Sequence, residues 1–324
     1  MEELLFSQDL DSTLLKKELA KMFPDKGRIA VKLHYGEEGN KTSLRPEYAK
    51  ALVDTLKELG CEPFLFDSST MYGGKRGDPK GHKKNAENQG FTEKSIGCPL
   101  EFEEDIKVYK TDNLEVEVCR KLIEADGMVV LSHVKGHPCS GFGAAIKNLG
   151  MGGVSKKTKT DIHSFAKPVY EGGCTACRHC QKICPFDGIE VTDHPEFGSC
   201  GGCDICIMEC PQGCLRPKVA PFDLLLSEGA LPVVKNSKAF YINVMKDITR
   251  LCDCLPDPGE RVCPDIGVLY GKDIVAIDKA SMDMINDKAG KDIFKEIHHK
   301  SPLLHIKEAE MLGMGSTQYK ITRL

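Results

Sequence analysis

The sequence contains no tryptophan, and only 6% of its 324 residues are aromatic. Its core must therefore rely on Leu, Ile, Val and Met side chains. The formal net charge is only −4, which predicts no general attraction to nucleic acid or to anionic lipid. No stretch approaches the roughly 18 uninterrupted apolar residues that a membrane-spanning helix requires. We therefore expect neither nucleic acid nor a membrane as a partner.

The first 19 residues also lack the features of a secretory signal. Acidic residues come early, and no apolar run leads to a small-residue cleavage site. We therefore expect a cytoplasmic protein, and this changes the meaning of its 16 cysteines. A reducing cytosol keeps thiols free, so they are available as metal ligands instead of forming disulfides.

Short apolar runs alternate with segments of helical periodicity on both sides of a cysteine-rich stretch. Strands are expected at residues 28–33, 63–66, 106–109, 127–131, 240–245 and 319–324, the last as an edge strand, and helices at 47–59 and 274–285. This alternation predicts an α/β fold with a mixed or parallel sheet flanked by helices.

The composition changes abruptly to Cys, Gly and Pro between residues 167 and 217, and ordinary patterning resumes after residue 221. We therefore predict a small inserted α+β module at residues 168–218. It would divide an α/β domain into a first part, residues 1–167, and a second part, residues 219–324.

The predicted module contains the pattern C-x₂-C-x₂-C-x₃-C-P twice, which is the spacing of bacterial two-cluster ferredoxins. Three closely spaced thiolates can wrap one face of a cubane, and the fourth cysteine opens a short helix that leads to the other cluster. The predicted ligands of one [4Fe–4S] cluster are Cys174, Cys177, Cys180 and Cys210, and those of the second are Cys200, Cys203, Cys206 and Cys184. A structural zinc site normally uses two separated C-x₂-C pairs, and a disulfide framework conflicts with a cytosolic location.

Polar residues follow the predicted strands at the ends where α/β proteins usually bind ligands. The candidates for direct chemistry are His34, His133, Lys135 and His137, with His163 as a further neighbour. Histidine is the commonest metal ligand and the usual proton shuttle near neutral pH, although a lone histidine is more often structural.

A glycine-rich run after the strand at 127–131 is a candidate anion site. Glycines that open a helix expose N–H groups, so we assign Gly141, Gly143, Lys147 and Asn148 to this site. Lys135 and Lys156 add positive charge nearby. The spacing fits neither a Walker A loop nor a dinucleotide fingerprint, so no nucleotide is predicted. The simpler alternative is a tight strand–helix connection with solvated lysines.

The remaining cysteines fall into two groups. Cys252 and Cys254, with Cys263, form a candidate extra site that could hold a metal ion together with His133 or His137, or act as a redox dithiol. Buried thiols acting as small apolar residues are the alternative. Four cysteines without partner spacing are interpreted as structural: Cys61, Cys98, Cys119 and Cys214.

Several segments together resemble a known family. They are residues 31–40, 63–67, 131–137, 141–152, 252–254, 264–267 and 275–278. Their order is similar to that of the iron–sulfur centre proteins defined by domain of unknown function 362, over roughly residues 28–286. The resemblance implies an α/β protein, often with an embedded ferredoxin module, from anaerobic bacteria or archaea. It implies no reaction. Residues 138–140 and Ala144 depart from the family pattern, so any role of Cys139 is specific to this chain.

The leading hypothesis is an iron–sulfur oxidoreductase. Its two [4Fe–4S] clusters would pass electrons to an anionic substrate or cofactor site in the α/β domain, because a ferredoxin module alone needs few residues. An unidentified anionic cofactor or a metal ion is a candidate further cofactor. One alternative is a non-catalytic electron carrier that docks to a redox partner protein. Another is a carrier of clusters or metal in cofactor assembly.

Overall fold

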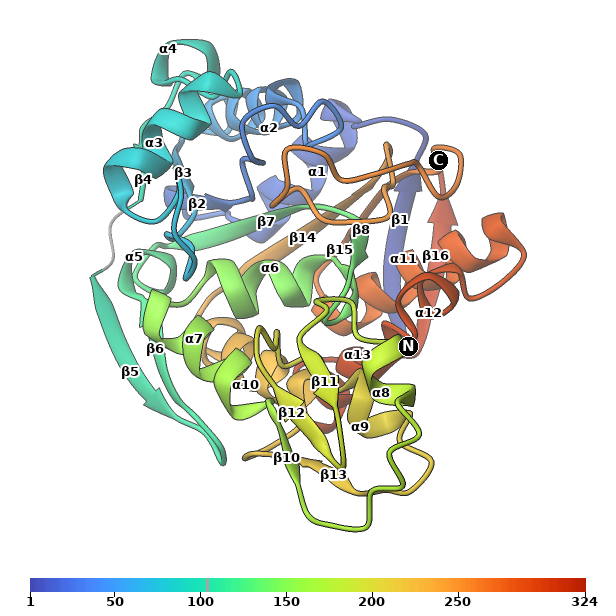
Figure 1. Cartoon of the computed structure of the whole chain (residues 1–324). Coiled ribbons are helices and arrows are strands. Elements are labelled where there is room, and N and C mark those ends of the chain that lie inside the picture. The colour runs from blue at the N-terminus through green and yellow to red at the C-terminus, as the bar shows by residue number, and fades with distance from the viewer. Residues whose placement is uncertain (103–104) are drawn as a thin grey trace.

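A central sheet of eight strands organises the computed structural model, which describes residues 1–102 and 105–324 (Figure 1). The strand order is β16-β1-β15-β14-β7-β2-β3-β4. The strands are β1 (Glu2–Ser7), β2 (Gly27–Lys32), β3 (Cys61–Phe66), β4 (Leu100–Glu101), β7 (Gly127–His133), β14 (Ala239–Met245), β15 (Gly267–Gly271) and β16 (Tyr319–Arg323). Strand β15 runs antiparallel to both neighbours, and the other pairs are parallel. The predicted α/β fold with a mixed sheet is confirmed.

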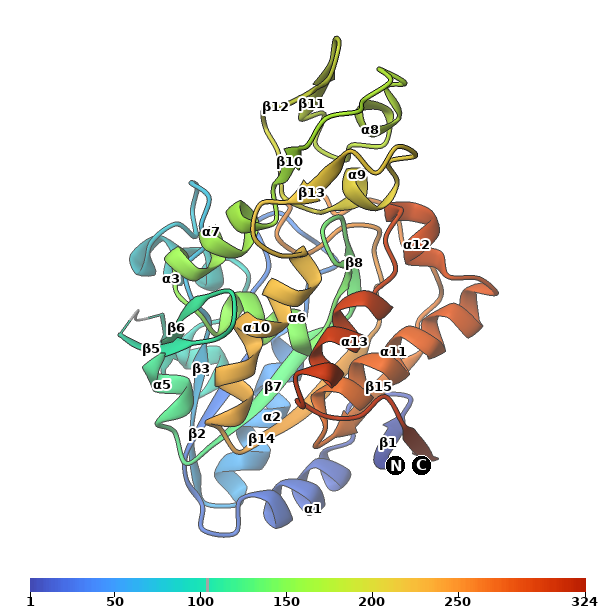
Figure 2. The ribbon, with the colours of Figure 1, turned by 90° about the horizontal axis from the view of Figure 1, so that it is seen from below.

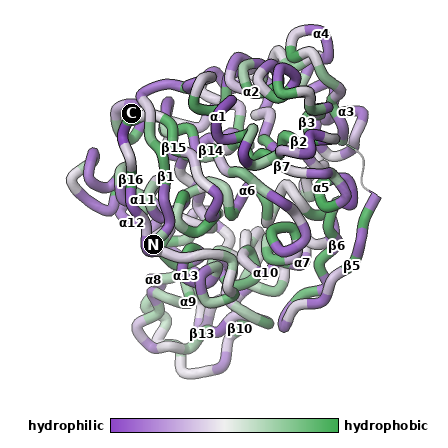
Figure 3. The backbone as a smooth tube through the Cα atoms, turned by 180° about the vertical axis from the view of Figure 1, so that it is seen from behind, coloured by the Kyte–Doolittle hydropathy of each residue, from purple (hydrophilic) through white to green (hydrophobic). Residues whose placement is uncertain are grey.

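Helices cover both faces of the sheet. One face carries α1 (Ser12–Met22), α2 (Pro46–Glu58), α3 (Pro79–Asn88) and α4 (Glu93–Ile96), and the other carries α6 (Ala145–Gly152), α7 (Lys156–Phe165), α10 (Phe222–Lys235), α11 (Ile274–Ala289), α12 (Ile293–His298) and α13 (Leu303–Met311). Successive side chains of a strand point to opposite faces. Met128 and Val130 of β7 therefore join one core, and Val129 and Leu131 join the other. Figure 3 shows the hydrophobic residues gathered along these central strands.

Several small elements lie outside the central sheet. The strand expected at residues 106–109 forms as β5 (Ile106–Lys110), but among the described residues it pairs only with β6 (Glu115–Cys119). Strand β6 leads into the short helix α5 (Arg120–Ile123). A second hairpin joins β8 (Lys135–His137) to β9 (Gly141–Gly143). Within the described residues, no helix is long and apolar enough to cross a membrane.

The cysteine-rich segment stands at one end of the molecule (Figure 2). It contains the short helices α8 (His179–Lys182) and α9 (Ile205–Met208) and two pairs of strands. Strand β10 (Pro168–Tyr170) pairs with β13 (Leu215–Pro217), and β11 (Ile189–Val191) pairs with β12 (Pro195–Phe197). Cys180, Ile189 and Cys206 belong to a small separate core, whereas Cys203 and Ile205 pack into the large one. The proposed division into domains therefore remains a prediction.

Candidate functional site

The site begins where parallel strands end at a common edge. Strand β2 is followed by β3 and β4 on one side, and the chain then returns to β7 on the other side of β2. The strand order thus reverses between β2 and β7, and in open α/β sheets ligands bind in the crevice outside such a point. Lys32 ends β2, and Ser132 and His133 end β7. The polar residues expected at the strand ends therefore meet at this crevice.

A cavity of about 450 Å³ lies at this edge, within the usual size range of small-molecule sites. Apolar and polar side chains both line it. The apolar ones include Met71, Pro138, Met151, Phe186, Leu251 and Leu255, and the polar ones include His34, Tyr72, Arg76, His137, Lys147 and His163. A recess of about 50 Å³ continues toward Lys32, Ser132, His133, Lys135, Gly143 and Asn148.

The floor of the recess is a buried ion pair. Lys32 Nζ donates to Asp67 Oδ1 at 3.0 Å and to Asn148 Oδ1 at 2.6 Å, and the amide of Asn148 donates to Ser132 Oγ at 3.0 Å. Burial favours the neutral acid, but Lys32 and His82 hold the pKa of Asp67 down to about 2. Burial also lowers the pKa of Lys32. Asn148 was expected to bind an anion, but its side-chain oxygen already accepts from Lys32 and its side-chain N–H already donates to Ser132.

Two of the candidate catalytic residues hold a second buried carboxylate. Asp253 is fully buried and accepts from His133 Nδ1 at 2.8 Å and from Lys135 Nζ at 2.7 Å. The other ring nitrogen of His133 lies 2.6 Å from the Lys246 carbonyl oxygen. Burial opposes ionisation, but His133 and Lys135 hold the pKa of Asp253 well below its usual range. Both residues therefore position the loop after β14.

His34 faces the cavity together with Arg76. Its Nδ1 accepts from the Gly36 N–H at 2.8 Å, and its Nε2 lies 3.0 Å from Arg76 Nη1 and 3.4 Å from Cys254 Sγ. Arg76 is buried and donates to Glu37 Oε2 and to the Tyr72 hydroxyl, both at 2.8 Å. Sequence reasoning missed Tyr72 and Arg76, although both lie in the polar, glycine-rich loop that follows β3.

Cys252 and Cys254 both line the cavity. Cys254 Sγ lies 3.4 Å from Nε2 of His34, whereas the sequence suggested His133 or His137 as its partner. Cys263 is instead buried in the large core. Within residues 1–102 and 105–324, no group of three or more His, Cys, Asp or Glu side chains is arranged to hold a metal ion.

The expected anion site at a helix start needs a correction. Gly141 and Gly143 belong to strand β9, and α6 begins only at Ala145. Its first N–H groups, those of Ala145 and Ile146, each donate to the Asp278 carboxylate at 2.9 Å. Burial raises the pKa of Asp278 to about 6. A carboxylate of the protein therefore takes the place that was expected for a ligand.

Lys147 is nevertheless a cation of the cavity. Among the residues that the structure describes, no carboxylate lies within ion-pair distance of its ammonium group. Lys147 also affects a neighbouring histidine. Burial lowers the pKa of His137 well below its usual range, and the positive charge of Lys147 lowers it further. Lys156 is exposed, and its Nζ lies 3.4 Å from the Gly77 carbonyl oxygen.

The second cysteine motif forms part of the cavity wall. Gly201, between Cys200 and Cys203, lines the cavity together with Phe186. The Gly201 carbonyl accepts from His163 Nδ1 at 2.7 Å and lies 3.9 Å from Cys139 Sγ. This contact joins the strand-end cavity to the cysteine-rich segment.

The two cysteine motifs repeat one backbone conformation. The residues before and after the second cysteine have positive φ in both, at 52° and 58° for Ala176 and Arg178 and at 63° for both Gly202 and Asp204. Left-handed backbone is uncommon for residues other than glycine and often marks a functional loop. N–H groups also point at sulfur: Ala176 lies 3.3 Å from Cys174 Sγ, and Gly202 lies 3.4 Å from Cys200 Sγ.

The thiols gather across the two motifs. Burial raises the pKa of Cys180, and the thiols of Cys174, Cys177 and Cys210 add to the rise. Burial likewise raises the pKa of Cys206, and Cys203, Cys200, Cys180 and Cys184 add to it. The fourth cysteine of each motif thus lies near the triplet of the other. Cys214, interpreted as structural, lies with its Sγ 3.4 Å from Cys210 Sγ.

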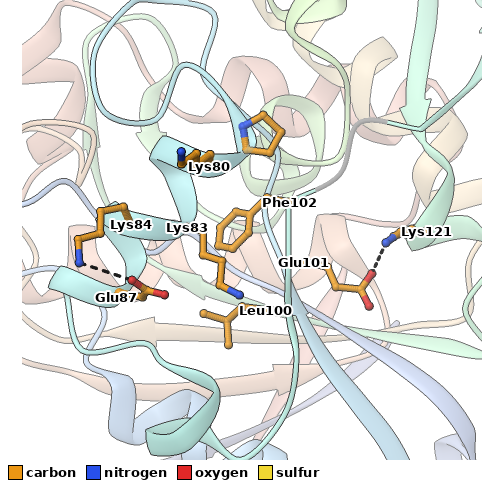
Figure 4. Close-up of a pocket in the computed structure, with 9 residues that line it drawn as sticks. Lys80, Lys83, Lys84, Glu87, Leu100, Glu101, Phe102 and Lys121 are labelled. Atoms are coloured by element: carbon orange, nitrogen blue, oxygen red, sulfur yellow. Dashed lines mark ion pairs between the residues drawn. The ribbon is translucent and has the colours of Figure 1, made fainter.

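A separate surface pocket of about 680 Å³ lies beside α3 and β4 (Figure 4). Lysines line much of it, and several are paired: Lys121 with Glu101 at 2.7 Å and Lys84 with Glu87 at 3.7 Å. Among the described residues, it shares no lining residue with the strand-end cavity.

Known proteins offer limited comparison. No curated protein matches the chain. A crystal structure of a protein from Thermotoga maritima is 15% identical with a TM-score of 0.41, covering 74% of this chain and 51% of that one. The lactate racemase apoprotein from Thermoanaerobacterium thermosaccharolyticum is 13% identical with a TM-score of 0.37, covering 75% and 50%. This chain spans about half the length of each, and neither likeness bears on its function. Residues 29–283 match the family described as a domain of unknown function, DUF362, and the chain belongs to that family.

Proposed function

We propose that this protein is an iron–sulfur oxidoreductase that acts on an anionic substrate or second cofactor in the strand-end cavity. Residues 168–218 would form a ferredoxin-like module with two [4Fe–4S] clusters. The observation that carries the proposal is the part of the cavity wall formed by the cysteine-rich segment, through Gly201 of the second motif and Phe186, which directly follows the first motif. A reducing compartment such as the cytoplasm, which keeps thiols available, suits this function.

The cysteine loops fit the proposed clusters in three ways. They supply two sets of four thiols, in each of which the fourth comes from the other motif, as in two-cluster ferredoxins. Residues at equivalent positions of the two loops have left-handed backbone conformations, so both loops follow the same path. Their N–H groups approach sulfur, and such bonds tune a cluster's reduction potential. Bound there, a [4Fe–4S] cluster supplies reversible one-electron transfer.

The cavity suits a small organic anion. Lys147 brings a positive charge that no described carboxylate neutralises, and Met71, Met151 and Leu251 offer apolar contact. His133 and Lys135 are engaged with Asp253, so His34 and His137 remain to face a ligand. Burial lowers the pKa of His137, which favours its neutral ring, and a neutral ring carries one N–H that can donate to an anion.

A partner that supplies electrons would dock at the other end of the segment. Cys177 of the first motif is exposed, whereas the second motif packs against the main body. Lys300 is buried there and donates to the Cys203 carbonyl at 2.7 Å. The proposed direction is therefore from an external redox protein, through the first motif and then the second, to the cavity.

Filling the cavity tests this function. The variant Met151→Trp places a bulky ring in the lining, and Met311→Trp makes the same change at a position that is 72% exposed. Each reduced, cluster-loaded protein is mixed anaerobically with a panel of small organic acids, and reoxidation is followed by visible absorbance. We expect an acid that reoxidises the wild type and Met311→Trp but not Met151→Trp. All three proteins should react equally with an outer-sphere oxidant such as oxidised methyl viologen.

The alternatives give different results in this experiment. An electron carrier without a substrate site would react with a partner protein or with the viologen, but with none of the acids. Equal reoxidation of the wild type and Met151→Trp by every reactive acid would also contradict a site in the cavity.

A further inference from the structure

The segment Cys252–Cys254 is fixed so that its two thiols face one way. The middle residue, Asp253, is held from the sheet side by His133 and Lys135. Its carbonyl also accepts from the Glu37 N–H at 2.8 Å. The segment is part of a turn, in which the Leu255 N–H donates to the Cys252 carbonyl at 3.2 Å. While Asp253 is held on the sheet side, the thiols of Cys252 and Cys254 both line the cavity.

The two thiols have different surroundings. Cys254 Sγ lies 3.4 Å from His34 Nε2, and Arg76 Nη2 lies 3.4 Å from the Cys254 carbonyl oxygen. Interaction with the Cys252 thiol holds the pKa of Cys254 well below its usual range despite burial, and His34 and Lys147 add to the effect. The same interaction, together with burial, raises the pKa of Cys252. The two thiols therefore differ in acidity, and Cys254 is the more acidic.

We propose that Cys252 and Cys254 are a redox-active dithiol that cycles between a reduced pair and an intrachain disulfide. This inference rests on the proposed function, because the oxidised [4Fe–4S] clusters are the electron acceptors. Oxidation of one thiol and one thiolate forms one Sγ–Sγ bond, releases one proton to solvent, and transfers two electrons, one to each cluster. Reduction takes two electrons and one proton and reverses the change. The pair would thus store two electrons beside the ligand site.

Metal binding explains these residues less well. The buried guanidinium of Arg76 lies 3.0 Å from His34 Nε2, and this positive charge would repel a metal cation there. The same charge stabilises a thiolate.

The sequence allows a clean measurement on the full-length protein. Trypsin cleaves after Arg250 and Arg261, so residues 251–261 form one peptide whose only cysteines are Cys252 and Cys254. The next peptide carries Cys263 as an internal reference. Cluster-loaded protein is equilibrated anaerobically with mixtures of reduced and oxidised dithiothreitol, quenched in acid, alkylated and digested. Mass spectrometry then measures the fraction of the peptide that holds an internal disulfide.

We expect that fraction to rise from about one tenth to about nine tenths over a hundredfold change in the ratio of oxidised to reduced dithiothreitol, as for one two-electron exchange. Cys263 should stay alkylated throughout. The variants Cys252→Ser and Cys254→Ser should abolish the transition, and Cys263→Ser should leave it unchanged. If both thiols stay alkylated in the most oxidising mixture, or if they cross-link to other peptides, the inference is wrong.

This test separates the inference from the proposed function. Dithiothreitol exchanges directly with the thiols, so the transition is measurable whether or not iron is bound. A protein that binds both clusters but shows no transition would overturn only the dithiol. A protein that binds no clusters would overturn the proposed function, and with it the electron acceptor named here.

Discussion

Lys147 is the residue whose charge most directly concerns a ligand. Replacing it with alanine removes a charged donor from the cavity, and such a hydrogen bond contributes about 1.5–3 kcal/mol. We expect Lys147→Ala to bind the acid identified by reoxidation at least about tenfold more weakly by calorimetry, with unchanged iron content. Lys156→Ala is the matched control, because that lysine is exposed. Equal affinities of wild type and Lys147→Ala would contradict the assignment.

Asp253 is expected to matter for stability. The change Asp253→Asn would leave Lys135 and His133 buried beside a neutral amide. Breaking a buried ion pair typically costs about 3–5 kcal/mol. We expect a loss of that order in the free energy of urea unfolding, whereas Asp257→Asn, on the exposed part of the same loop, should change it by less than about 1 kcal/mol. A similar small effect of both variants would show that the anchor is unimportant.

Asp67 predicts a pH dependence. Its pKa in the folded protein is about 2, below the value of about 3.9 for an unfolded aspartate. Its stabilising contribution is therefore present above about pH 4 and is lost as the pH falls toward 2. The stability advantage of wild type over Asp67→Asn should shrink between pH 5 and pH 3 in urea titrations, to a degree limited by the cost of burying Lys32. A constant difference would contradict this assignment.

The sequence predicted which polar side chains lie together at the strand ends, but not which hydrogen bonds they form. Lys32, Asp67 and His133 could be placed at the strand ends because parallel strands end at a common edge. The partner of His133 is Asp253, which lies 120 positions later in a loop without regular structure. No local pattern indicates such a contact, so the sequence could not show that His133 bonds Asp253, and its role in catalysis stays a prediction.

Elements were predictable where local periodicity was strong. The helix expected at residues 47–59 is α2, and the terminal strand β16 lies at the sheet edge as expected. Strands β1 and β15 were not predicted, because they pair with each other across nearly the whole chain, with Leu5 opposite Tyr270. The glycines at 141–143 were interpreted as a helix start, but pairing with β8 makes them a strand. Long-range pairing overrides the local signal in both cases.

The fourth cysteine of each motif is expected to bind the cluster held mainly by the other motif. Cys210 lies near the triplet of the first motif, so Cys210→Ser should damage the cluster held by Cys174, Cys177 and Cys180 and spare the other. Cys214 is close enough to substitute, so the double variant Cys210→Ser/Cys214→Ser should show the larger loss. Electron paramagnetic resonance of the reduced protein distinguishes the two clusters. Loss of the second cluster with the first intact would mean that each motif binds its cluster locally.

The whole molecule combines a sheet whose edge carries polar side chains with a cysteine-rich segment that packs beside the cavity at that edge. Hydrogen exchange should reflect the unequal docking of the two motifs. Cys203 and Ile205 pack into the large core, so residues 200–206 should stay protected after iron is removed, whereas residues 174–184 should lose protection. Equal loss in both segments would show that the second motif depends on iron as much as the first.

The central claim is that one chain binds two [4Fe–4S] clusters, and its most direct test is the iron and sulfide content of anaerobically reconstituted protein. The two sets of four cysteines predict about eight iron and eight sulfide per chain, with a broad visible absorbance that bleaches on reduction. About four iron in fully reconstituted protein, or zinc in place of iron, would contradict the account.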